Sequence, residues 1–374
     1  MAKGKGKKTR RIHDWQQRYQ GAEDERDPTP RRQKVAPRAV KLPPARLLSP
    51  EDNLDALPKA VGMVEGFPPG VVLVRVGGQQ HLRCGIVKTF RAPERATTLA
   101  VGDEVTVALS RSDPGAAQDA DGDRVDGMIL SRAPRRSALS RPQPRSDKRH
   151  GLYDYQPFEK VIVANMDLLA IVVSVNSPPI RPRLIDRYLI AAERGEMGVV
   201  LVVNKTDLDA LPAWLGEEMA RRGVAVVACS AVTGDGLATL AAALQGRRSV
   251  LAGASGAGKS TLINALIPRA NAFTQEVSEK TLRGRHTTTA ACVYEVPGGG
   301  IVVDTPGIRE LGMPIDPAQL PWYFPEFEPL SPQCKFRDCT HTHEPQCAVR
   351  DAVEQGRIPT RRYESYVKLL ETIR

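Results

Sequence analysis

The sequence contains no long run of apolar residues. No apolar stretch approaches the roughly 18 residues that a bilayer-spanning helix needs, and no apolar segment follows the basic stretch "MAKGKGKKTRR", as a secretory signal would require. That stretch also lacks the apolar face of a membrane-binding helix. Cysteine is scarce, with six in 374 residues. We therefore expect a cytoplasmic protein without a membrane partner, and in that compartment disulfides are not expected.

Negative charge is scarce in two segments, which makes both strongly basic. Residues 1–60 hold fifteen Lys and Arg against eight Asp and Glu, and residues 131–150 hold seven against one. The formal net charge is +10, so the rest of the chain is about neutral or slightly acidic. Two basic segments on a near-neutral body favour a polyanionic partner, most simply nucleic acid. A solvated tail that only maintains solubility is the alternative.

Residues 1–157 divide into three parts by composition. Residues 1–58 are rich in Pro, Lys and Arg, which predicts a disordered basic tail. Residues 59–131 contain five short β-branched runs broken by Gly and Pro, which predicts a small β-barrel. Five strands fit an OB-fold, a common platform for nucleic acids, although strand spacing alone does not distinguish it from other small barrels. Residues 132–157 then read as a basic linker.

From residue 158 to 322 apolar runs alternate with helical patterns. Near-continuous apolar runs are typical of parallel strands covered on both faces, and the alternation predicts a doubly wound α/β domain. Residues 323–374 contain a Cys/His cluster and a helical pattern, which predicts a small α domain. The strands expected in the α/β domain are 167–175, 197–204, 224–230, 248–255, 291–298 and 300–307.

A phosphate-binding loop follows the fourth of these strands. The sequence "GASGAGKST" (253–261) has the spacing Gly-x4-Gly-Lys-Ser and precedes a helical segment, which is the context this motif requires. Its backbone N–H groups and the helix N-terminus would face the phosphates. Lys259 would reach the β- and γ-phosphates, and Ser260 would ligate Mg²⁺. The nucleotide-binding residues predicted here are Gly253, Ala254, Ser255, Gly256, Ala257, Gly258, Lys259, Ser260 and Thr261.

A second phosphate-facing motif, "DTPG" (304–307), lies about forty residues further on, at the end of the last predicted strand. Asp304 can hold Mg²⁺ through a water molecule, and Gly307 can contact the γ-phosphate. The DxxG pattern is weak alone, but its distance from the phosphate loop and its place at a strand end make it informative.

The motif "NKTD" (Asn204, Lys205, Thr206 and Asp207) selects the base. The Asp207 carboxylate can accept hydrogen bonds from guanine N1–H and N2–H₂, which adenine cannot donate. Asn204 would brace the loop, and the stem of Lys205 would lie against the base. The next strand ends in Ser230 and Ala231, where the Ala231 N–H can meet guanine O6. These motifs predict GTP rather than ATP.

The order of the motifs is changed relative to an ordinary GTPase, because "NKTD" comes about fifty residues before the phosphate loop. In a doubly wound sheet the ligand binds at the carboxyl ends of the strands, wherever those ends fall in the sequence. The order therefore predicts a circularly permuted GTPase domain in which one site survives.

With these motifs in this order, the chain resembles the family of circularly permuted, ribosome-small-subunit-dependent GTPases. The matching segments include "RLIDRYLIAAE", "GASGAGKSTLINAL", "GRHTTTAA", "VVDTPGIRE" and "CKFRDCTHTHEPQC", and the resemblance covers residues 60–374. It implies an OB-fold barrel, a permuted GTPase domain and a zinc-binding domain. It also implies binding to the small (30S) ribosomal subunit and its rRNA late in assembly, with hydrolysis of GTP to GDP there. We expect a monomer.

The resemblance also assigns roles in "GRHTTT" (284–289), the first switch. One of Thr287–Thr289, for which we assign Thr288, would close on Mg²⁺ and the γ-phosphate. Ile308 stands where many GTPases have the Gln that orients the attacking water. The resemblance points to His286 for that task. The alternative is a surface histidine with no catalytic role.

Three cysteines cluster near the carboxyl terminus as Cys334-x4-Cys339-x-His341-x5-Cys347. Three Cys and one His match a closed, tetrahedral structural zinc site. His343 is a second candidate for the fourth ligand, and the C-x-H pattern of the family selects His341. The other cysteines are isolated in strand-like segments, and we expect them to be small core residues; they are Cys84, Cys229 and Cys292.

Three functions compete on this sequence. The first is a GTPase that serves ribosome assembly, and the second is a nucleic-acid-binding module with GTP as a conformational latch. The third is a metabolic GTPase without an RNA partner. The complete set of hydrolytic motifs favours the first over the second, and the basic tail, barrel and zinc cluster disfavour the third.

Overall fold

The computed structural model describes residues 57–77, 80–90, 97–109, 125–143, 158–267, 291–304 and 315–373. Of the predicted basic tail, only the last two residues lie in these ranges. His286, Thr287–Thr289, Gly307 and Ile308 fall outside them, so the predictions for the first switch and for the end of "DTPG" concern residues that the structure does not describe. No helix within the described ranges is long and apolar enough to cross a membrane.

The five strands predicted after residue 58 form a closed, OB-like barrel. The order around it is β1-β2-β3-β5-β4, with β3 and β5 parallel and the other described pairs antiparallel. β-Branched and other aliphatic side chains alternate inward and fill the interior. The strands are β1 (Lys59–Gly66), β2 (Val72–Val76), β3 (Gln80–Ile86), β4 (Glu104–Leu109) and β5 (Gly127–Arg132).

Part of the predicted linker is a strand. β6 (Ala138–Gln143) pairs antiparallel with β7 (Phe158–Ala164) in a two-stranded sheet. Val163 of β7 also bridges to Val101, which joins this pair to the barrel segment before β4. The sequence "ALSRPQ" gives little sign of a strand, because Arg and Pro interrupt its alternation. Pro142 is tolerated because β6 is an edge strand.

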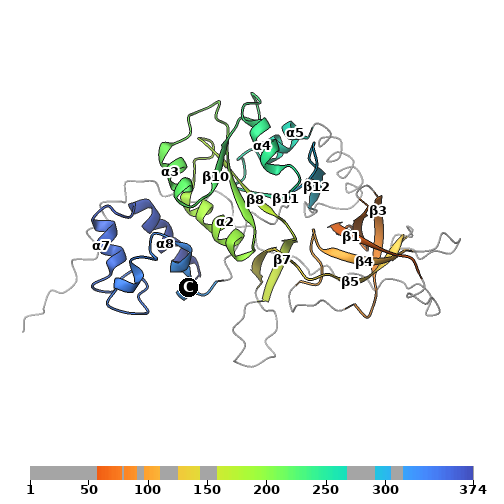
Figure 1. Ribbon diagram of the computed structural model, residues 1–374, viewed down its shortest axis with the longest axis horizontal. Helices are drawn as coiled ribbons and strands as arrows, with labels where there is room; N and C mark the ends of the chain where they lie inside the picture. Colours follow the sequence, from red (N-terminus) through yellow and green to blue (C-terminus); the bar gives the residue numbers. More distant parts are fainter. Residues whose placement is uncertain are drawn as a thin grey trace, which may run out of the picture. The chain divides into compact units, whose positions relative to one another are not determined.

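The second sheet has the order β10-β9-β8-β11-β13-β12 (Figure 1). Its first five strands are parallel, and β12 runs antiparallel at the edge beside β13. Each predicted strand of the α/β domain is present, which confirms the doubly wound architecture. The strands are β8 (Leu168–Ser174), β9 (Gly198–Asn204), β10 (Ala225–Ala228), β11 (Arg248–Ala252), β12 (Cys292–Glu295) and β13 (Ile301–Asp304).

Helices cover both faces of this sheet. α2 (Pro182–Arg194) and α3 (Ala213–Arg221) share one apolar cluster with Leu169, Ile171 and Val173 of β8. The intervening β8 residues Leu168, Ala170 and Val172 belong to a second cluster with the helices α4 (Leu237–Leu244) and α5 (Lys259–Leu266). Successive side chains of β8 therefore point to opposite faces of the sheet, and both faces are buried. This explains why the strand is a continuous apolar run.

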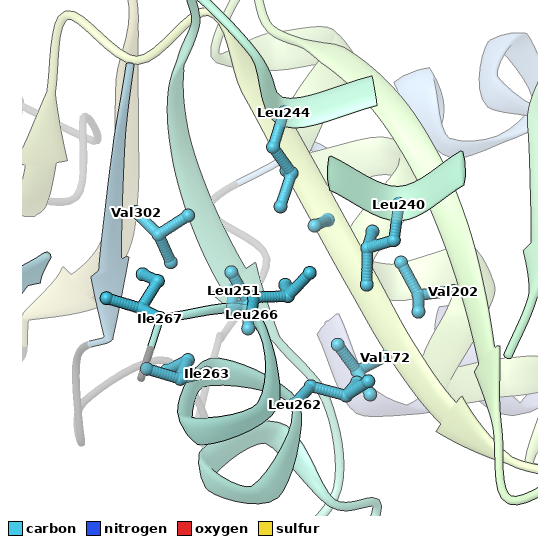
Figure 2. A pocket seen from close by; sticks show the side chains of 11 residues that line it. Val172, Val202, Leu240, Leu244, Leu251, Leu262, Ile263, Leu266, Ile267 and Val302 are labelled. Carbon is cyan, nitrogen blue, oxygen red and sulfur yellow. The ribbon is translucent and has the colours of Figure 1, made fainter. Parts of the chain in front are cut away.

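The core beneath α4 and α5 is almost completely filled. Figure 2 shows Leu240, Leu244, Leu262 and Ile263 directed toward the strands, and together with their neighbours they enclose a space of about 10 Å³. A space of this size is too small for a ligand. It therefore belongs to the core that supports α5 and is not a binding site.

The carboxyl-terminal part is built from short elements around an apolar and aromatic cluster. They are η3 (Pro317–Tyr323), η4 (Ser331–Gln333), α7 (Ala348–Glu354) and α8 (Thr360–Ile373). Phe324, Phe327 and Tyr366 lie at its centre, with ring centroids 4.9 to 5.3 Å apart. This small α domain agrees with the sequence prediction.

A buried ion network attaches α8 to α2, which lies beside it (Figure 1). Arg362 of α8 pairs with Asp186 of α2 and with Glu326, and its side chain is 2% exposed. Ser365 also donates to Asp186, at 2.5 Å. Burial raises the pKa of the Asp186 carboxyl, and the nearby Arg222 guanidinium opposes that shift. Removing one member would leave a buried charge uncompensated, so the network fixes the orientation of α8 on α2.

Candidate nucleotide and zinc sites

The carboxyl ends of the parallel strands bring the predicted nucleotide motifs to one edge of the sheet. Asn204, at the end of β9, lies opposite Ser174 of β8. On β11, Leu251 lies opposite Asp304 of β13, and the phosphate loop begins two residues later. Residues more than fifty positions apart in sequence therefore meet at this edge, as the permuted order requires.

Two glycines let the phosphate loop pack closely against its neighbours. Gly253 has a φ of +149°, and a Cβ there would lie 2.1 Å from the carbonyl oxygen of Val172. Gly258, the last residue before α5, has a φ of +93°, and a Cβ would lie 2.2 Å from Nδ2 of Asn204. Neither position can hold another residue without displacing the backbone or the Asn204 amide.

Lys259 folds back over this loop. Its Nζ donates to the carbonyl oxygens of Gly253 and Ala254 at 2.8 and 2.9 Å. The ammonium therefore lies over the loop, where it can meet the phosphates of a bound nucleotide. Ser260 and Thr261, in the first turn of α5, are exposed, so their hydroxyls can be reached by a ligand at the helix N-terminus.

Asn204 connects three motifs. Its side chain is almost completely buried, and its Nδ2 donates to the carbonyl oxygen of Ala257 in the phosphate loop at 3.0 Å. Its Oδ1 accepts a hydrogen bond from the N–H of Ala231 at 3.1 Å. One amide thus holds "NKTD", the phosphate loop and the Ser230–Ala231 turn in fixed relative positions. The same Ala231 N–H is the group predicted to meet guanine O6.

The carboxylate that the sequence predicts to read the base, that of Asp207, is oriented by a buried serine. Ser230 Oγ donates to Asp207 Oδ1 at 2.6 Å, and accepts from the backbone N–H groups of Val232 and Thr233 at 3.2 Å each. A carboxylate fixed through one oxygen keeps lone pairs for two guanine hydrogens. Lys205 has a φ of +67°, and its Nζ donates to the carbonyl oxygen of Ser177 at 2.5 Å.

The four predicted zinc ligands converge, with their ligand atoms all within 4.8 Å of one another. Sγ of Cys334 and Sγ of Cys347 are 3.9 Å apart, and both lie 3.5 to 3.6 Å from Nδ1 of His341. A tetrahedral zinc with ordinary bond lengths separates two sulfurs by about 3.8 Å and a sulfur from a nitrogen by about 3.6 Å. The donor set and its spacing therefore fit zinc.

The structure also separates the two candidate histidines. His341 is buried, has a φ of +57°, and directs Nδ1 to the sulfurs, while its Nε2 lies 3.3 Å from Ser331 Oγ. The His343 side chain is 77% exposed and lies outside the cluster. A hydrogen bond to the second ring nitrogen is the usual way of orienting a metal-binding imidazole.

Glu344 was not recognised as a site residue from the sequence. Its carboxylate accepts from the N–H and hydroxyl of Thr340 at 3.0 and 2.6 Å, and from the N–H of Thr342 at 3.1 Å. Burial acts to raise the pKa of this carboxyl, but these hydrogen bonds outweigh it and lower the pKa to about 2. Glu344 thereby fixes the turn that presents Cys339 and His341. The spacing E-x-x-C just before Cys347 gave no recognisable signal.

The remaining cysteines behave as core residues, as predicted for Cys84 and Cys229, which are fully buried. Burial raises the pKa of the Cys84 thiol to about 12, with a contribution from Asp126, and that of Cys229 to about 11. Cys292 is partly buried on β12, and burial raises its pKa too. None of these thiols is a reactive group at neutral pH.

Comparison with known proteins agrees with this geometry. The family model described as RsgA GTPase matches residues 132–314. Two relatives named small ribosomal subunit biogenesis GTPase RsgA come from Chlorobaculum parvum and Gemmatimonas aurantiaca. They are 38% and 41% identical over 316 and 317 residues, which is 83% and 81% of this chain and 97% of each relative.

Solved structures show the same fold. YjeQ from Thermotoga maritima has a TM-score of 0.59 at 31% identity, covering 84% of this chain and 99% of its own. YloQ, described as a circularly permuted GTPase, has a TM-score of 0.54 at 24% identity, covering 84% and 95%. A circular permutation, which the order of the motifs predicts for this chain, is therefore also described for a solved structure of this fold. With nearly the whole length of its relatives matched, this chain belongs to the RsgA GTPase family and is a GTP hydrolase.

Proposed function

We propose that this chain acts in the biogenesis of the small ribosomal subunit, as a cytoplasmic monomer that binds the subunit and its rRNA and hydrolyses GTP to GDP and phosphate there. The observation that carries the GTP site is the junction at Asn204, where one buried amide holds the base-reading and phosphate-binding loops together. The partner is proposed from the names of the relatives. The closed barrel and the strongly basic segments support an RNA partner.

In this proposal the base lies between "NKTD" and the Ser230–Ala231 turn. Asp207 accepts hydrogen bonds from guanine N1–H and N2–H₂, and Ser230 holds its carboxylate in position. On nucleotide binding the Ala231 N–H exchanges its acceptor, Oδ1 of Asn204, for guanine O6, and the stem of Lys205 covers one face of the base. Thr206 is held in the turn by the bond from its N–H to the carbonyl oxygen of Cys229 at 3.2 Å.

The phosphates then lie on the loop from Gly253 to Thr261, where Lys259 exchanges its two carbonyl partners for phosphate oxygens. Ser260 and Thr288 would hold Mg²⁺ directly, and Asp304 would hold it through water. Mg²⁺, when bound, neutralises charge that develops on the transferred phosphoryl group. Gly307 would contact the γ-phosphate through its N–H, and His286 would orient the attacking water in place of the Gln that Ile308 replaces.

Cys334, Cys339, His341 and Cys347 would hold one structural zinc ion. Three thiolates this close together need a compensating cation, and zinc would supply that charge. The four residues would fill all four positions of a tetrahedral zinc ion, which would leave no position for substrate. The zinc would stabilise the turn that Tyr363 and Tyr366 join to α8 through hydrogen bonds to the carbonyl oxygens of His341 and Thr340.

The variant Asp207→Asn tests the base-recognition site. An amide cannot accept both guanine hydrogens, so we expect GTP affinity to fall at least about a hundredfold and the preference over ATP to shrink. Xanthine carries an oxygen where guanine carries its amino group, so the variant should gain affinity for XTP. Equilibrium titration with the three nucleotides measures this. Ser230→Ala is the matched control, since it loosens Asp207 without changing its chemistry, and should weaken GTP without favouring XTP. An unchanged GTP preference in Asp207→Asn would contradict the assignment.

The variant Cys347→Ala tests the zinc site. We expect elemental analysis to find one zinc ion per wild-type chain and none in the variant, together with loss of the folded structure of residues 323–373. Cys292→Ala is the control, because it removes a thiol outside the cluster and should keep the metal. Zinc-free wild-type protein, prepared without chelators and fully folded, would contradict the proposal.

A further inference from the structure

One charged group joins the barrel to the nucleotide-binding sheet, and the mechanism above makes no use of it. Arg75 of β2 donates from Nε to Oε1 of Glu65 at 2.5 Å and from Nη1 to Oε1 of Glu295 at 2.8 Å. Glu65 belongs to β1 of the barrel, whereas Glu295 is the last residue of β12. A single guanidinium therefore connects the barrel to the edge strand of the other sheet.

The barrel holds this guanidinium in a fixed orientation. The side chains of Arg75 and Glu65 are only 10% and 9% exposed. The second oxygen of Glu65 lies 2.6 Å from Nδ1 of His81 on β3, so both carboxylate oxygens have partners. The Glu295 side chain is 63% exposed. The barrel thus presents a pre-positioned cation, and the carboxylate of β12 is the more exposed partner.

β12 is well placed to influence the nucleotide site. It is the edge strand, and in the described part of the chain its only strand partner within that sheet is β13. Cys292 at its start lies opposite Asp304, and Glu295 at its end lies opposite Ile301. β1 lies beside it (Figure 1). A displacement of β12 along or away from β13 would therefore reach the strand that ends at Asp304.

We propose that Arg75 and Glu295 are positioning residues for hydrolysis on the ribosomal subunit. When the barrel binds RNA and is displaced, the Arg75–Glu295 pair transmits the displacement of the barrel through β12 and β13 to Asp304. The inference rests on the proposed function, in which the barrel contacts rRNA. It concerns how that contact raises the rate of hydrolysis, and it assigns no part of nucleotide or subunit binding to the pair.

A second ion pair between the barrel and the sheet provides a matched control. Arg248 Nη1 lies 2.8 Å from Oε1 of Glu104 on β4. Arg248 starts β11, which is an interior strand bonded on both sides by β8 and β13. Since β11 is hydrogen-bonded to a strand on each side, we expect that breaking this pair changes the position of β11 little. Breaking it tests whether any loss of attachment between the barrel and the sheet has the same effect.

The experiment compares Glu295→Gln, Arg75→Ala, the double variant and Glu104→Gln with the wild type. The measurements are kcat and KM for GTP with and without saturating small subunits, and the subunit concentration that gives half-maximal stimulation. We expect Glu295→Gln to lower the stimulated kcat roughly three- to tenfold. Its unstimulated kcat, KM and half-saturating concentration should stay within about twofold of wild type. The double variant should lose no more than Arg75→Ala alone, because Arg75→Ala already removes the interaction with Glu295.

Three results would overturn the inference while leaving the proposed function intact. The first is a wild-type protein that small subunits stimulate and a Glu295→Gln variant with the same ratio of stimulated to unstimulated kcat. The second is a loss of stimulated kcat in Glu104→Gln equal to that in Glu295→Gln. The third is a double variant whose loss of stimulated kcat equals the sum of the losses in the two single variants. Glu295 is largely exposed, so its variant should fold even if Arg75→Ala leaves Glu65 buried without its partner and destabilises the barrel. A wild-type protein that small subunits do not stimulate would instead contradict the proposed function itself.

Discussion

Lys259→Ala should leave GTP hydrolysis at or below about a thousandth of the wild-type rate, both alone and with small subunits. The Nζ of Lys259 lies over the phosphate loop, held by the carbonyl oxygens of Gly253 and Ala254. In the proposed site this ammonium would neutralise charge on the β- and γ-phosphates in the transition state. Removing one pre-positioned charged or hydrogen-bonding group at such a site usually costs two to three orders of magnitude in rate, and the loss of phosphate binding adds to this.

Lys205→Ala is the matched control, because it removes a second lysine at the same edge of the sheet. The Nζ of Lys205 contacts the carbonyl oxygen of Ser177, and its stem is proposed to cover the base. Its loss should weaken nucleotide binding and raise KM with little change in kcat. Single-turnover rates at saturating GTP separate the two variants. A Lys259→Ala protein with normal turnover would place the phosphates elsewhere in the molecule.

His286→Ala should lower subunit-stimulated hydrolysis by roughly two to four orders of magnitude, the range expected for a lost general acid–base or water-positioning group. Binding of GTP and of the small subunit should change little, because the proposed task of His286 is to orient water. Hydrolysis without subunits should fall much less. The variant should then accumulate on small subunits in the GTP state, which co-sedimentation with radiolabelled GTP measures.

His343→Ala is the control for this prediction, since its side chain is exposed and lies outside the zinc cluster. It should keep both rates. The informative quantity is the ratio of stimulated to unstimulated hydrolysis. If His286→Ala retains the wild-type ratio, His286 is a surface residue, and a switch threonine, the backbone or the ribosome must orient the water.

Much of the nucleotide site could be predicted because its motifs are local and each has one structural meaning. Lys259 follows a strand and starts a helix, and Asp207 follows a strand. The residues that flank each motif in the sequence were therefore enough to predict its place at the edge of the sheet. The topology of parallel strands then requires that those ends meet. The Cys/His cluster was predictable for the same reason, since three of its four residues lie within eight residues of one another.

The remaining features depend on partners that are distant in sequence. Asp186 and Arg362 are 176 residues apart, and Arg75 and Glu295 are 220 residues apart. In each case the sequence around one residue indicates only an ordinary charged side chain on a helix or strand. The partner comes close only when the chain folds. Strand β6 was missed because its stability comes from pairing with β7 rather than from an alternating pattern of its own.

The central claim is that one GTP site, assembled from permuted strand ends, is stimulated by the small ribosomal subunit. The most direct measurement is the rate of GTP hydrolysis by the wild-type protein alone, with isolated small subunits, with isolated large subunits and with bare rRNA, at one salt concentration. We expect slow hydrolysis by the protein alone and a large increase with small subunits only. Equal rates in all four conditions, or stimulation by large subunits instead, would contradict it.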